Sequence, residues 1–600
     1  QRLRDEIGRI RERGYAIDDQ EVVVGVFCVA VPVLDRMGRS VGAISVTGDK
    51  ARGIQLAAPV IGNVSITGSV AALGENALAV ETDDISGRLT IQGTINARGF
   101  RYASRPTRAE DRVKLDADDM LVGNSALVVA GNVGGGILLD AAPIVGLDYD
   151  GDGILNSDDT DDDNDGVLDT TDTDIDNDGI ADSSEGTASL SVAGPAPALI
   201  IGSATDSITI GKVAATGDNA FGLVIRGTIS ANGLLDDFSA TGIRIGAGGG
   251  RTTTLERGMS VIGAVSATAY NASSQALHLT SGSVVDEIKV DGTLFASTTA
   301  TSGPTAPPVP VSGIPYEGAF TAYGVRIDNN ATTTKLNVGG AITVVTNGEN
   351  SNAVAIWDGA GTLTSVTNSG AIRAFVVPTD DNNDTDDDDA DPNNETVLGT
   401  AVAMDLRNAR AGVTVVQIGI DDGDDDLDPD TEDADDDGDG VDDADEPSIT
   451  GNIYFGAFAD SLNLQNGQFV GDVSFGAGAD VFSLSGGATS YGDVRDSDGR
   501  LTVNVTAGDL LITNADVIDA TALTVGATSS VVFTADPNAL TNTRFDVATA
   551  TIASGAKLGL VLTDLISAPT TYTVIRTDTP GGLTVGTLDQ SLVGNSPYLF

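Results

Sequence analysis

Short stretches of alternating apolar and polar residues, separated by glycine, recur along most of the sequence, and this repetition is its most constraining feature. Residues 451–467 align with residues 471–487 at a period of 20. The matched pairs are Ile453 and Val473, Phe455 and Phe475, Asp460 and Asp480, Leu462 and Phe482, and Leu464 and Leu484. A period near 20 with glycine at the turns predicts a solenoid, because each turn can bury its apolar edge only against its neighbours.

Two shorter motifs extend the repetition toward the N-terminus. The first, Asn/Gln-Ala-x-small-aliphatic, occupies residues 76–80, 219–223, 275–279 and 352–356. The second, Gly-small-aliphatic, starts at Gly93, Gly227, Gly292, Gly340 and Gly370. Three copies of the first precede a copy of the second by 17, 17 and 18 residues. This regularity indicates equivalent positions in successive turns of one coil.

Composition narrows the fold class. The 600 residues include 74 glycines, and aromatic residues make up 4%. Small and β-branched residues suit a narrow core repeated along one axis. We therefore expect an all-β fold, a right-handed parallel β-helix, with a short α/β fragment at the N-terminus. A set of separate β-sandwiches is the alternative, although sandwiches need large residues on two facing sheets.

Charge is distributed unevenly along the chain. Residues 1–52 hold 9 Lys/Arg and 8 Asp/Glu, whereas residues 53–600 hold 23 (32 − 9) and 79 (87 − 8), so nearly all of the net charge of −55 lies in the second part. Such a surface repels nucleic acid and anionic lipid and favours divalent cations. Cys28, the single cysteine, excludes a disulfide within the chain and a cysteine zinc site. The sequence contains no run of 18 apolar residues, so it predicts no membrane-spanning helix.

Changes in charge and in proline content along the sequence divide the chain into segments. Three segments interrupt the repeat: two are acidic, and the third, residues 303–315, is rich in proline and predicts a stiff exposed loop. We expect an N-terminal fragment over 1–52, β-helix turns over 53–146, acidic calcium repeats over 147–186, turns over 187–378, an acidic insertion with one calcium loop over 379–447, and the last turns over 448–600.

Aspartates at regular spacing carry the clearest sign of a binding site. The pattern Asp-x-Asp-x-Asp-Gly starts at Asp148, Asp161 and Asp174, 13 residues apart each time, and again at Asp435. Carboxylates at positions 1, 3 and 5 can converge on one hard cation if glycine at position 6 lets the chain turn sharply; position 7 adds a backbone carbonyl and position 12 a last carboxylate. Oxygen ligands alone favour Ca²⁺.

All four copies contain every one of these positions. The predicted ligands are Asp148, Asp150, Asp152, Ile154 and Asp159; Asp161, Asp163, Asp165, Val167 and Asp172; Asp174, Asp176, Asp178, Ile180 and Glu185; and Asp435, Asp437, Asp439, Val441 and Glu446. The alternative is a solvated acidic linker. Residues 422–432 have Leu427 where the glycine belongs, and residues 380–391 lack the glycine, so both are expected to be plain acidic loops.

Loops only 13 residues apart leave no room for the helices of an EF-hand. The tandem arrangement over residues 148–185 instead resembles thrombospondin type 3 repeats, and residues 435–446 resemble a single such repeat. The resemblance implies that calcium ions organise a segment without an apolar core.

The C-terminal part resembles a bacterial autotransporter passenger. The match rests on residues 569–575, Leu592 and residues 597–600, and on Gly-Asp-Val-x-Phe-Gly-Ala-Gly at residues 471–478. The resemblance implies a passenger displayed at the surface of a Gram-negative bacterium or secreted, followed beyond Phe600 by its own membrane-spanning β-barrel. It also implies a structural or adhesive role with a host, surface or matrix ligand that the sequence does not identify.

Residues 10–48 resemble part of the effector-binding domain of IclR-type transcription regulators. The match comprises Arg-Glu-Arg-Gly-Tyr-Ala-x-Asp-Asp at 11–19, Gly-x-x-Cys-Val-Ala-x-Pro-Val at 25–33, and Asp-x-x-Gly-x-x-Val-x-Ala-x-Ser-Val-Thr-Gly at 35–48. The family binds small organic acids, and the resemblance places the corresponding residues at Asp18, Cys28, Ser45 and Thr47. The helix-turn-helix and most of that domain are not in this sequence, so we expect a vestigial fragment without a working pocket.

Catalytic residues are not expected. A Ser-His-Asp triad would need His278, the single histidine, and the glycine run at 246–250 lacks the Lys-Ser/Thr of a phosphate loop. Three classes remain: a surface-displayed structural or adhesive passenger, which we favour; a β-helical polysaccharide-processing enzyme, which activity on acidic polysaccharides would reveal; and a transcription regulator, which needs a DNA-binding domain.

Overall fold

The computed structural model describes residues 16–19, 27–30, 44–141, 156, 159–164, 166–175, 186–217, 219–300, 320–348, 351–377, 399–420, 441, 446–565 and 570–587. The chain forms two compact units. Unit 1 comprises Gln1–Thr333, Val345–Asn352 and Val376–Gly399, and unit 2 comprises Thr334–Val344, Ala353–Phe375 and Thr400–Phe600. Strands β25 (Ala341–Asn347), β26 (Asn352–Asp358) and β28 (Ala371–Val377) contain residues of both units.

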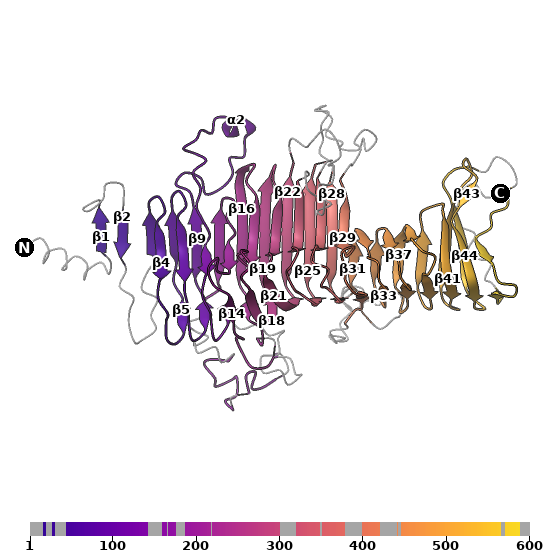
Figure 1. The fold of residues 1–600 in the computed structure, drawn as a ribbon, viewed down its shortest axis with the longest axis horizontal. Helices are drawn as coiled ribbons and strands as arrows, with labels where there is room; N and C mark the ends of the chain where they lie inside the picture. The colour runs from indigo at the N-terminus through magenta and orange to yellow at the C-terminus, as the bar shows by residue number, and fades with distance from the viewer. Residues whose placement is uncertain are drawn as a thin grey trace, which may run out of the picture. The chain divides into compact units, whose positions relative to one another are not determined.

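In unit 1, successive turns of the chain add strands to three parallel sheets, here named A, B and C (Figure 1). Sheet A contains β3 (Ile44–Thr47), β6 (Val70–Leu73), β9 (Thr94–Arg98), β12 (Ser189–Ala193), β16 (Thr228–Asp236), β19 (Ala264–Tyr270) and β22 (Thr293–Thr299). Sheet B contains β4 (Arg52–Leu56), β7 (Leu78–Thr82), β10 (Leu127–Val129), β13 (Leu199–Ile201), β17 (Ala240–Ile245), β20 (Ser274–Leu279) and β23 (Thr321–Ile327). Sheet C contains β5 (Val64–Ile66), β8 (Leu89–Ile91), β11 (Ile137–Leu139), β14 (Ile208–Ile210), β15 (Leu223–Ile225), β18 (Thr253–Val261) and β21 (Ser283–Val290).

The alternation of residues explains why these segments form strands with one buried face. Along β19 every second side chain is buried, and Val265, Ala267 and Ala269 are fully enclosed. Val265 is in register with Ile229 of β16 and Leu294 of β22, so the core consists of aliphatic rows that run from turn to turn. Burying one such side chain stabilises the fold by about 1.5–3 kcal/mol, and this gain in free energy is repeated at every turn of the stack.

Glycine is required at the corner where sheet C leads into sheet A. In most turns of unit 1 this corner has two residues, as at Arg226-Gly227 between β15 and β16. A Cβ added to Gly263 would lie 2.0 Å from the carbonyl oxygen of Gly227, and one added to Gly292 would lie 2.0 Å from that of Gly263. The glycines of the Gly-small-aliphatic motif therefore lie where the backbone of the preceding turn leaves no room for a side chain.

Unit 2 repeats the same three-sheet plan. Sheet A contains β28, β31 (Ser448–Thr450), β34 (Gln468–Val470), β37 (Thr489–Gly492), β40 (Asp509–Ile512), β42 (Ser530–Asp536) and β45 (Lys557–Leu562), with β43 (Thr541–Asn542) antiparallel to β42. Sheet B contains β26, β29 (Ala401–Asp405), β32 (Asn452–Tyr454), β35 (Val473–Phe475) and β38 (Val494–Asp496). Sheet C contains β24 (Lys335–Val338), β27 (Ser365–Asn368), β30 (Thr414–Gln417), β33 (Ser461–Leu464), β36 (Val481–Leu484), β39 (Thr502–Val505), β41 (Val517–Val525), β44 (Arg544–Ile552), β46 (Ile575–Thr577) and β47 (Leu583–Val585).

The register confirms the 20-residue period. Ile453 pairs with Val473, and Leu462 with Phe482, in adjacent parallel strands. Phe455 and Phe475 stack with ring centroids 5.2 Å apart and planes 6° apart. The repeated phenylalanine of the sequence is thus an aromatic row in the core of unit 2.

At the N-terminal end, β1 (Ala16–Asp19) and β2 (Phe27–Ala30) are antiparallel, and β2 is antiparallel to β3. Strand β3 pairs in parallel with β6, so the ladder of sheet A already includes Ile44–Thr47. The helix expected over residues 3–14 lies outside the described residues. One short helix, α2 (Ala109–Arg112), is described, and no described helix is long and apolar enough to cross a membrane.

The fold class is confirmed in its main feature: the described chain is nearly all β, with long parallel sheets consistent with a parallel β-helix or solenoid.

Candidate calcium loops and a buried carboxylate ladder

The first acidic segment leaves the coil at the corner between sheets C and A, where other turns have two residues. It follows β11 and returns at β12, and the N–H of Ala188 donates to the carbonyl oxygen of Asp140 at 2.7 Å, which closes its base. Beneath this point Arg226 forms a buried ion pair with Asp140 at 2.9 Å, and Gln92 donates to the same carboxylate at 3.0 Å. The acidic segment therefore starts from a buried, hydrogen-bonded base.

Within this segment, the described residues show how the aspartate at position 12 of one loop leads into the next loop. Asp159 Oδ1 accepts the N–H groups of Thr160 and Asp161 at 2.6 and 3.1 Å. Thirteen residues later, Asp172 Oδ1 accepts those of Thr173 and Asp174 at 2.5 and 3.0 Å. Both are local turns in which a carboxylate binds backbone N–H groups. The 13-residue spacing of the sequence thus corresponds to a repeated backbone conformation.

The loop that starts at Asp161 contains the sharp turn expected at position 6. Asp161 Oδ2 accepts the N–H of Gly166 at 3.1 Å, so position 1 contacts position 6 directly. Gly166 has a φ of +95° with open space around its α-carbon, and Asn164 has a φ of +54°. Glycine and asparagine are the residues that adopt such angles most easily. The backbone of this loop therefore makes the sharp turn that the sequence pattern predicts.

Carboxylates are crowded in this loop, and the apolar side chains described beside them are exposed. Asp162 is 8% exposed, whereas Val167 and Leu168 are 41% and 54% exposed. Burial, followed by the neighbouring carboxylates of Asp169, Asp159 and Asp163, raises the pKa of Asp162 to about 6. Among the described residues, Asp161 Oδ1 and Asp162 Oδ1 are buried without a hydrogen-bond partner. Buried carboxylate oxygens of this kind fit a hard cation such as Ca²⁺.

The structure describes only part of the predicted ligand set. Asp159, Asp161, Asp163, Val167, Asp172 and Asp174 are described, together with Val441 and Glu446. The others lie outside the described residues: Asp148, Asp150, Asp152, Ile154, Asp165, Asp176, Asp178, Ile180, Glu185, Asp435, Asp437 and Asp439. No group of three or more His, Cys, Asp or Glu placed to hold a metal occurs in the described part. The calcium assignment stays a prediction.

One position that the sequence analysis missed is the ninth of each loop. Asp169, at position 9 of the loop that starts at Asp161, accepts the N–H of Asp162 at 3.0 Å. Asn156, at position 9 of the first loop, is 7% exposed. The other loops have Asp182 and Asp443 at this place. A polar residue at position 9 of a calcium loop contributes a ligand, often through water, so the regular spacing could have identified all four.

The acidic insertion predicted over 379–447 is not continuous, because β29 and β30 of unit 2 lie within it; the part with the calcium loop leaves unit 2 between β30 of sheet C and β31 of sheet A. Of its predicted ligands, Val441 is 8% exposed and Glu446 is half-buried. An added Cβ on Gly419, just after β30, would lie 2.7 Å from a methyl group of Val441. Val441 and Glu446, at positions 7 and 12 of the loop, therefore lie close to the point where the insertion leaves unit 2.

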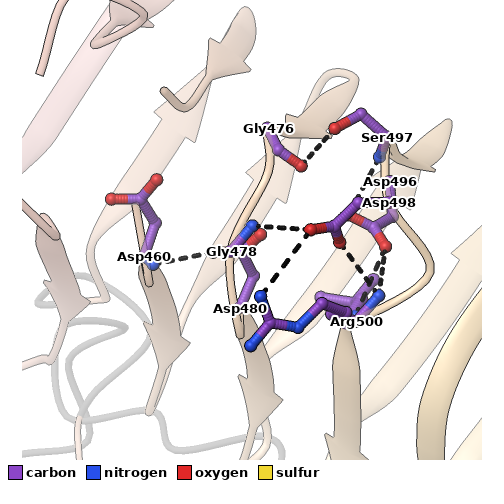
Figure 2. A network of polar contacts seen from close by, with 9 residues as sticks. Asp460, Gly476, Gly478, Asp480, Asp496, Ser497, Asp498 and Arg500 are labelled. Atoms are coloured by element: carbon purple, nitrogen blue, oxygen red, sulfur yellow. Dashed lines mark hydrogen bonds and ion pairs between the residues drawn. The ribbon is translucent and has the colours of Figure 1, made fainter. Parts of the chain in front are cut away.

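A different group of aspartates occupies the corner between sheets B and C of unit 2 (Figure 2). Asp460 Oδ1 accepts the N–H of Val413 at 2.7 Å, and Asp480 Oδ1 accepts the N–H of Asp460 at 2.7 Å. One turn further, Asp498 Oδ2 accepts the N–H of Gly478 at 3.0 Å. Each carboxylate satisfies a backbone donor of the preceding turn, which makes a ladder of side chains.

The two inner carboxylates of this ladder are deeply buried. Asp460 is 1% exposed and Asp480 fully buried, and Oδ2 of each has no hydrogen-bond partner among the described residues. Burial raises the pKa of Asp460 to about 6, although hydrogen bonds from Val413 and Gly456 oppose the rise. Burial also raises the pKa of Asp480. The sequence showed Asp460 and Asp480 as repeat partners but gave no sign of their burial.

The residues expected from the IclR-type resemblance fall on the antiparallel strands at the N-terminus. Asp18 of β1 is the register partner of Cys28 of β2, and Cys28 that of Val46 in β3. Ser45 and Thr47 flank Val46 on β3. The backbone thus places all four positions on three neighbouring strands.

Comparison with known proteins gives one match. The family described as "Bacterial transcriptional regulator IclR C-terminal" matches residues 1–61. No curated protein and no solved structure matches the chain. The IclR-like fragment of the sequence analysis is supported by this match, which covers about a tenth of the chain.

Proposed function

We propose that residues 53–600 form the surface-exposed passenger of an autotransporter, with a structural or adhesive role and with calcium loops that stabilise its acidic insertions. The observation that carries the proposal is the repeated coil of three parallel sheets, from which the acidic segments leave at one type of corner. In this proposal the coil is a right-handed β-helix. Its contacts join neighbouring turns, so it can fold one turn after another.

The acidic insertions support an extracellular setting. Uncompensated carboxylates repel one another, and the loop around Asp161 has exposed Val167 and Leu168 in place of an apolar core. Free calcium at extracellular concentrations would neutralise this charge and order the loops, as ligand binding stabilises the state that it binds. Asp161, Asp163, the carbonyl of Val167, Asp169 and Asp172 are the described residues that would hold an ion in the second loop.

The proposal is tested by locating the protein in the bacterium that produces it. Intact cells are treated with protease or labelled with an antibody against residues 448–600, and a cytoplasmic protein serves as the control for lysis. We expect cleavage and labelling of intact cells. Protection of the protein in intact cells, with cleavage after lysis, would contradict surface display.

A second candidate is a transcription regulator, because the one family match is to a regulator domain. Its effector site would use Asp18, Cys28, Ser45 and Thr47. We place it second because the match ends at residue 61 and the remaining residues carry a strongly negative charge, which repels DNA. Binding of a small organic acid that is lost on Cys28→Ala would favour this candidate.

A further inference from the structure

Sheet B of unit 1 carries a row of arginine and histidine side chains on its outer face. Arg244 of β17, His278 of β20 and Arg326 of β23 are register partners in three adjacent parallel strands. The residues on either side of each are fully buried in the core, so these three side chains lie on the opposite face. Adjacent strands are about 4.8 Å apart. Three basic side chains at this spacing are unusual in a chain with a net charge of −55.

Two members of the row share one carboxylate. Arg326 Nε lies 2.8 Å from Asp328 Oδ1, and His278 Nε2 lies 2.7 Å from Asp328 Oδ2. The guanidinium of Arg326 also lies 5.3 Å from the centre of the Tyr323 ring. Burial and the charges of Arg326 and Arg244 lower the pKa of His278, although Asp328 opposes this, so His278 is neutral at pH 7. Asp328 therefore balances Arg326.

Arg244 has no carboxylate partner among the described residues. It is half-buried, its Nε atom is fully buried without a hydrogen-bond partner, and burial lowers its pKa. The Nε–H group of Arg244 has therefore lost water without gaining an acceptor, which is unfavourable. The described part of the chain thus offers Arg244 no carboxylate, which leaves its guanidinium available to a ligand from outside the chain.

The row continues beyond Arg244 with apolar side chains. Ile200 of β13 is the register partner of Arg244, and Val128 of β10 is that of Ile200. Both are half-buried. From Val128 to Arg326 the row crosses five strands, or roughly 19 Å. Its length exceeds a single sugar, and it offers apolar contact at one end and polar nitrogen-bearing side chains at the other.

We propose that this row binds an acidic polysaccharide, with Arg244 holding the carboxylate of a uronic acid residue. His278 supplies a neutral ring beside this carboxylate, and Ile200 and Val128 support the neighbouring sugar rings. Guanidinium is suited to carboxylate because its N–H groups can form two parallel hydrogen bonds to it. This inference names a ligand class for the adhesive role proposed above and rests on that role.

The test is calorimetric titration of the full chain with trigalacturonate, with EDTA present so that calcium cannot bridge the carboxylates of the two partners. Galactotriose is the neutral control ligand. We expect wild-type protein to bind trigalacturonate and not galactotriose. Arg244→Gln should weaken binding roughly 10- to 100-fold, the usual effect of losing a charge-assisted pair, and Arg244→Lys should weaken it less.

Lys335→Gln is the matched control, because it removes one positive charge at an exposed position outside the row. It should bind within about twofold of the wild type if, as we expect, exposed single charges matter little. Circular dichroism checks that each variant keeps its β structure. Equal binding by Arg244→Gln and the wild type, or no binding by the wild type at millimolar ligand, would overturn the proposal.

Monogalacturonate distinguishes a polymer from a free acid. We expect it to bind more weakly than the trimer; equal binding would overturn the assignment to a polysaccharide. None of these outcomes depends on where the protein is located, so failure of this inference and failure of the surface proposal are separate results.

Discussion

Replacing Asp460 by Asn should stabilise the protein at neutral pH and make its stability less dependent on pH. Asp460 is 1% exposed, and its Oδ2 is buried without a hydrogen-bond partner in the described part. The substitution keeps Oδ1, which accepts the N–H of Val413 at 2.7 Å, and removes the charge.

The magnitude follows from the pKa of Asp460, which burial raises from 3.8 to about 6 in the folded protein. The folded state therefore holds a proton that the unfolded chain releases above about pH 4. The contribution of Asp460 to stability is fully present below pH 3.8 and is lost as the pH rises through about 6. That difference corresponds to ~3 kcal/mol. Asp460→Asn should thus gain up to ~3 kcal/mol over the wild type between acidic and neutral pH.

Urea unfolding followed by circular dichroism, repeated at several pH values between about 4.5 and 7.5, measures this gain. Asp509→Asn is the control, because Asp509 is exposed on β40. The free energy of unfolding of Asp460→Asn minus that of the wild type should grow with pH, whereas the same difference for Asp509→Asn should stay nearly constant. A constant difference for Asp460→Asn would refute the reasoning, since Asp460 would then titrate alike in both states.

Three further changes test the packing, each by urea unfolding. Gly263→Ala places a Cβ 2.0 Å from the carbonyl oxygen of Gly227 and should cost about 1–3 kcal/mol; an unchanged midpoint would show that the corner can widen. Phe475→Ala removes a stacked ring of the core and should cost about 3–5 kcal/mol, far more than Tyr491→Ala at a 52% exposed site. Arg226→Ala leaves Asp140 buried and unpaired and should lower the free energy of unfolding by about 3–5 kcal/mol. Arg226→Met should lower it by a similar amount. A small loss of stability would show that Asp140 is not buried in solution.

The repeat was predictable from the sequence because a solenoid places equivalent residues at a fixed period. The pairs Ile453–Val473 and Leu462–Phe482 follow directly from the 20-residue alignment. The copies of the first motif show the limit of this reasoning. Asn76, Gln275 and Asn352 lead into sheet B, whereas Asn219 leads into β15 of sheet C. It is also the copy that lacks the 17- or 18-residue spacing, so spacing identifies equivalent positions better than composition.

Burial was harder to predict than periodicity. Asp460 and Asp480 sit where most proteins have exposed turn residues, and their burial depends on backbone N–H groups of the preceding turn, about 50 and 20 residues away. Arg244 and His278 are likewise far apart in sequence and meet only because the strands stack. The calcium loops are local, and so their 13-residue spacing was readable without knowledge of the fold.

Calcium binding by the full chain tests the central claim most directly. Calorimetric titration of metal-free protein with CaCl₂ should show uptake of several ions at up to millimolar concentration, together with protection of residues 147–186 from protease. Asp161→Asn should reduce the uptake, and Asp387→Asn, in the acidic segment that lacks the glycine, should leave it unchanged. No heat of binding at millimolar calcium, or equal loss in both variants, would contradict the assignment of these loops as calcium sites.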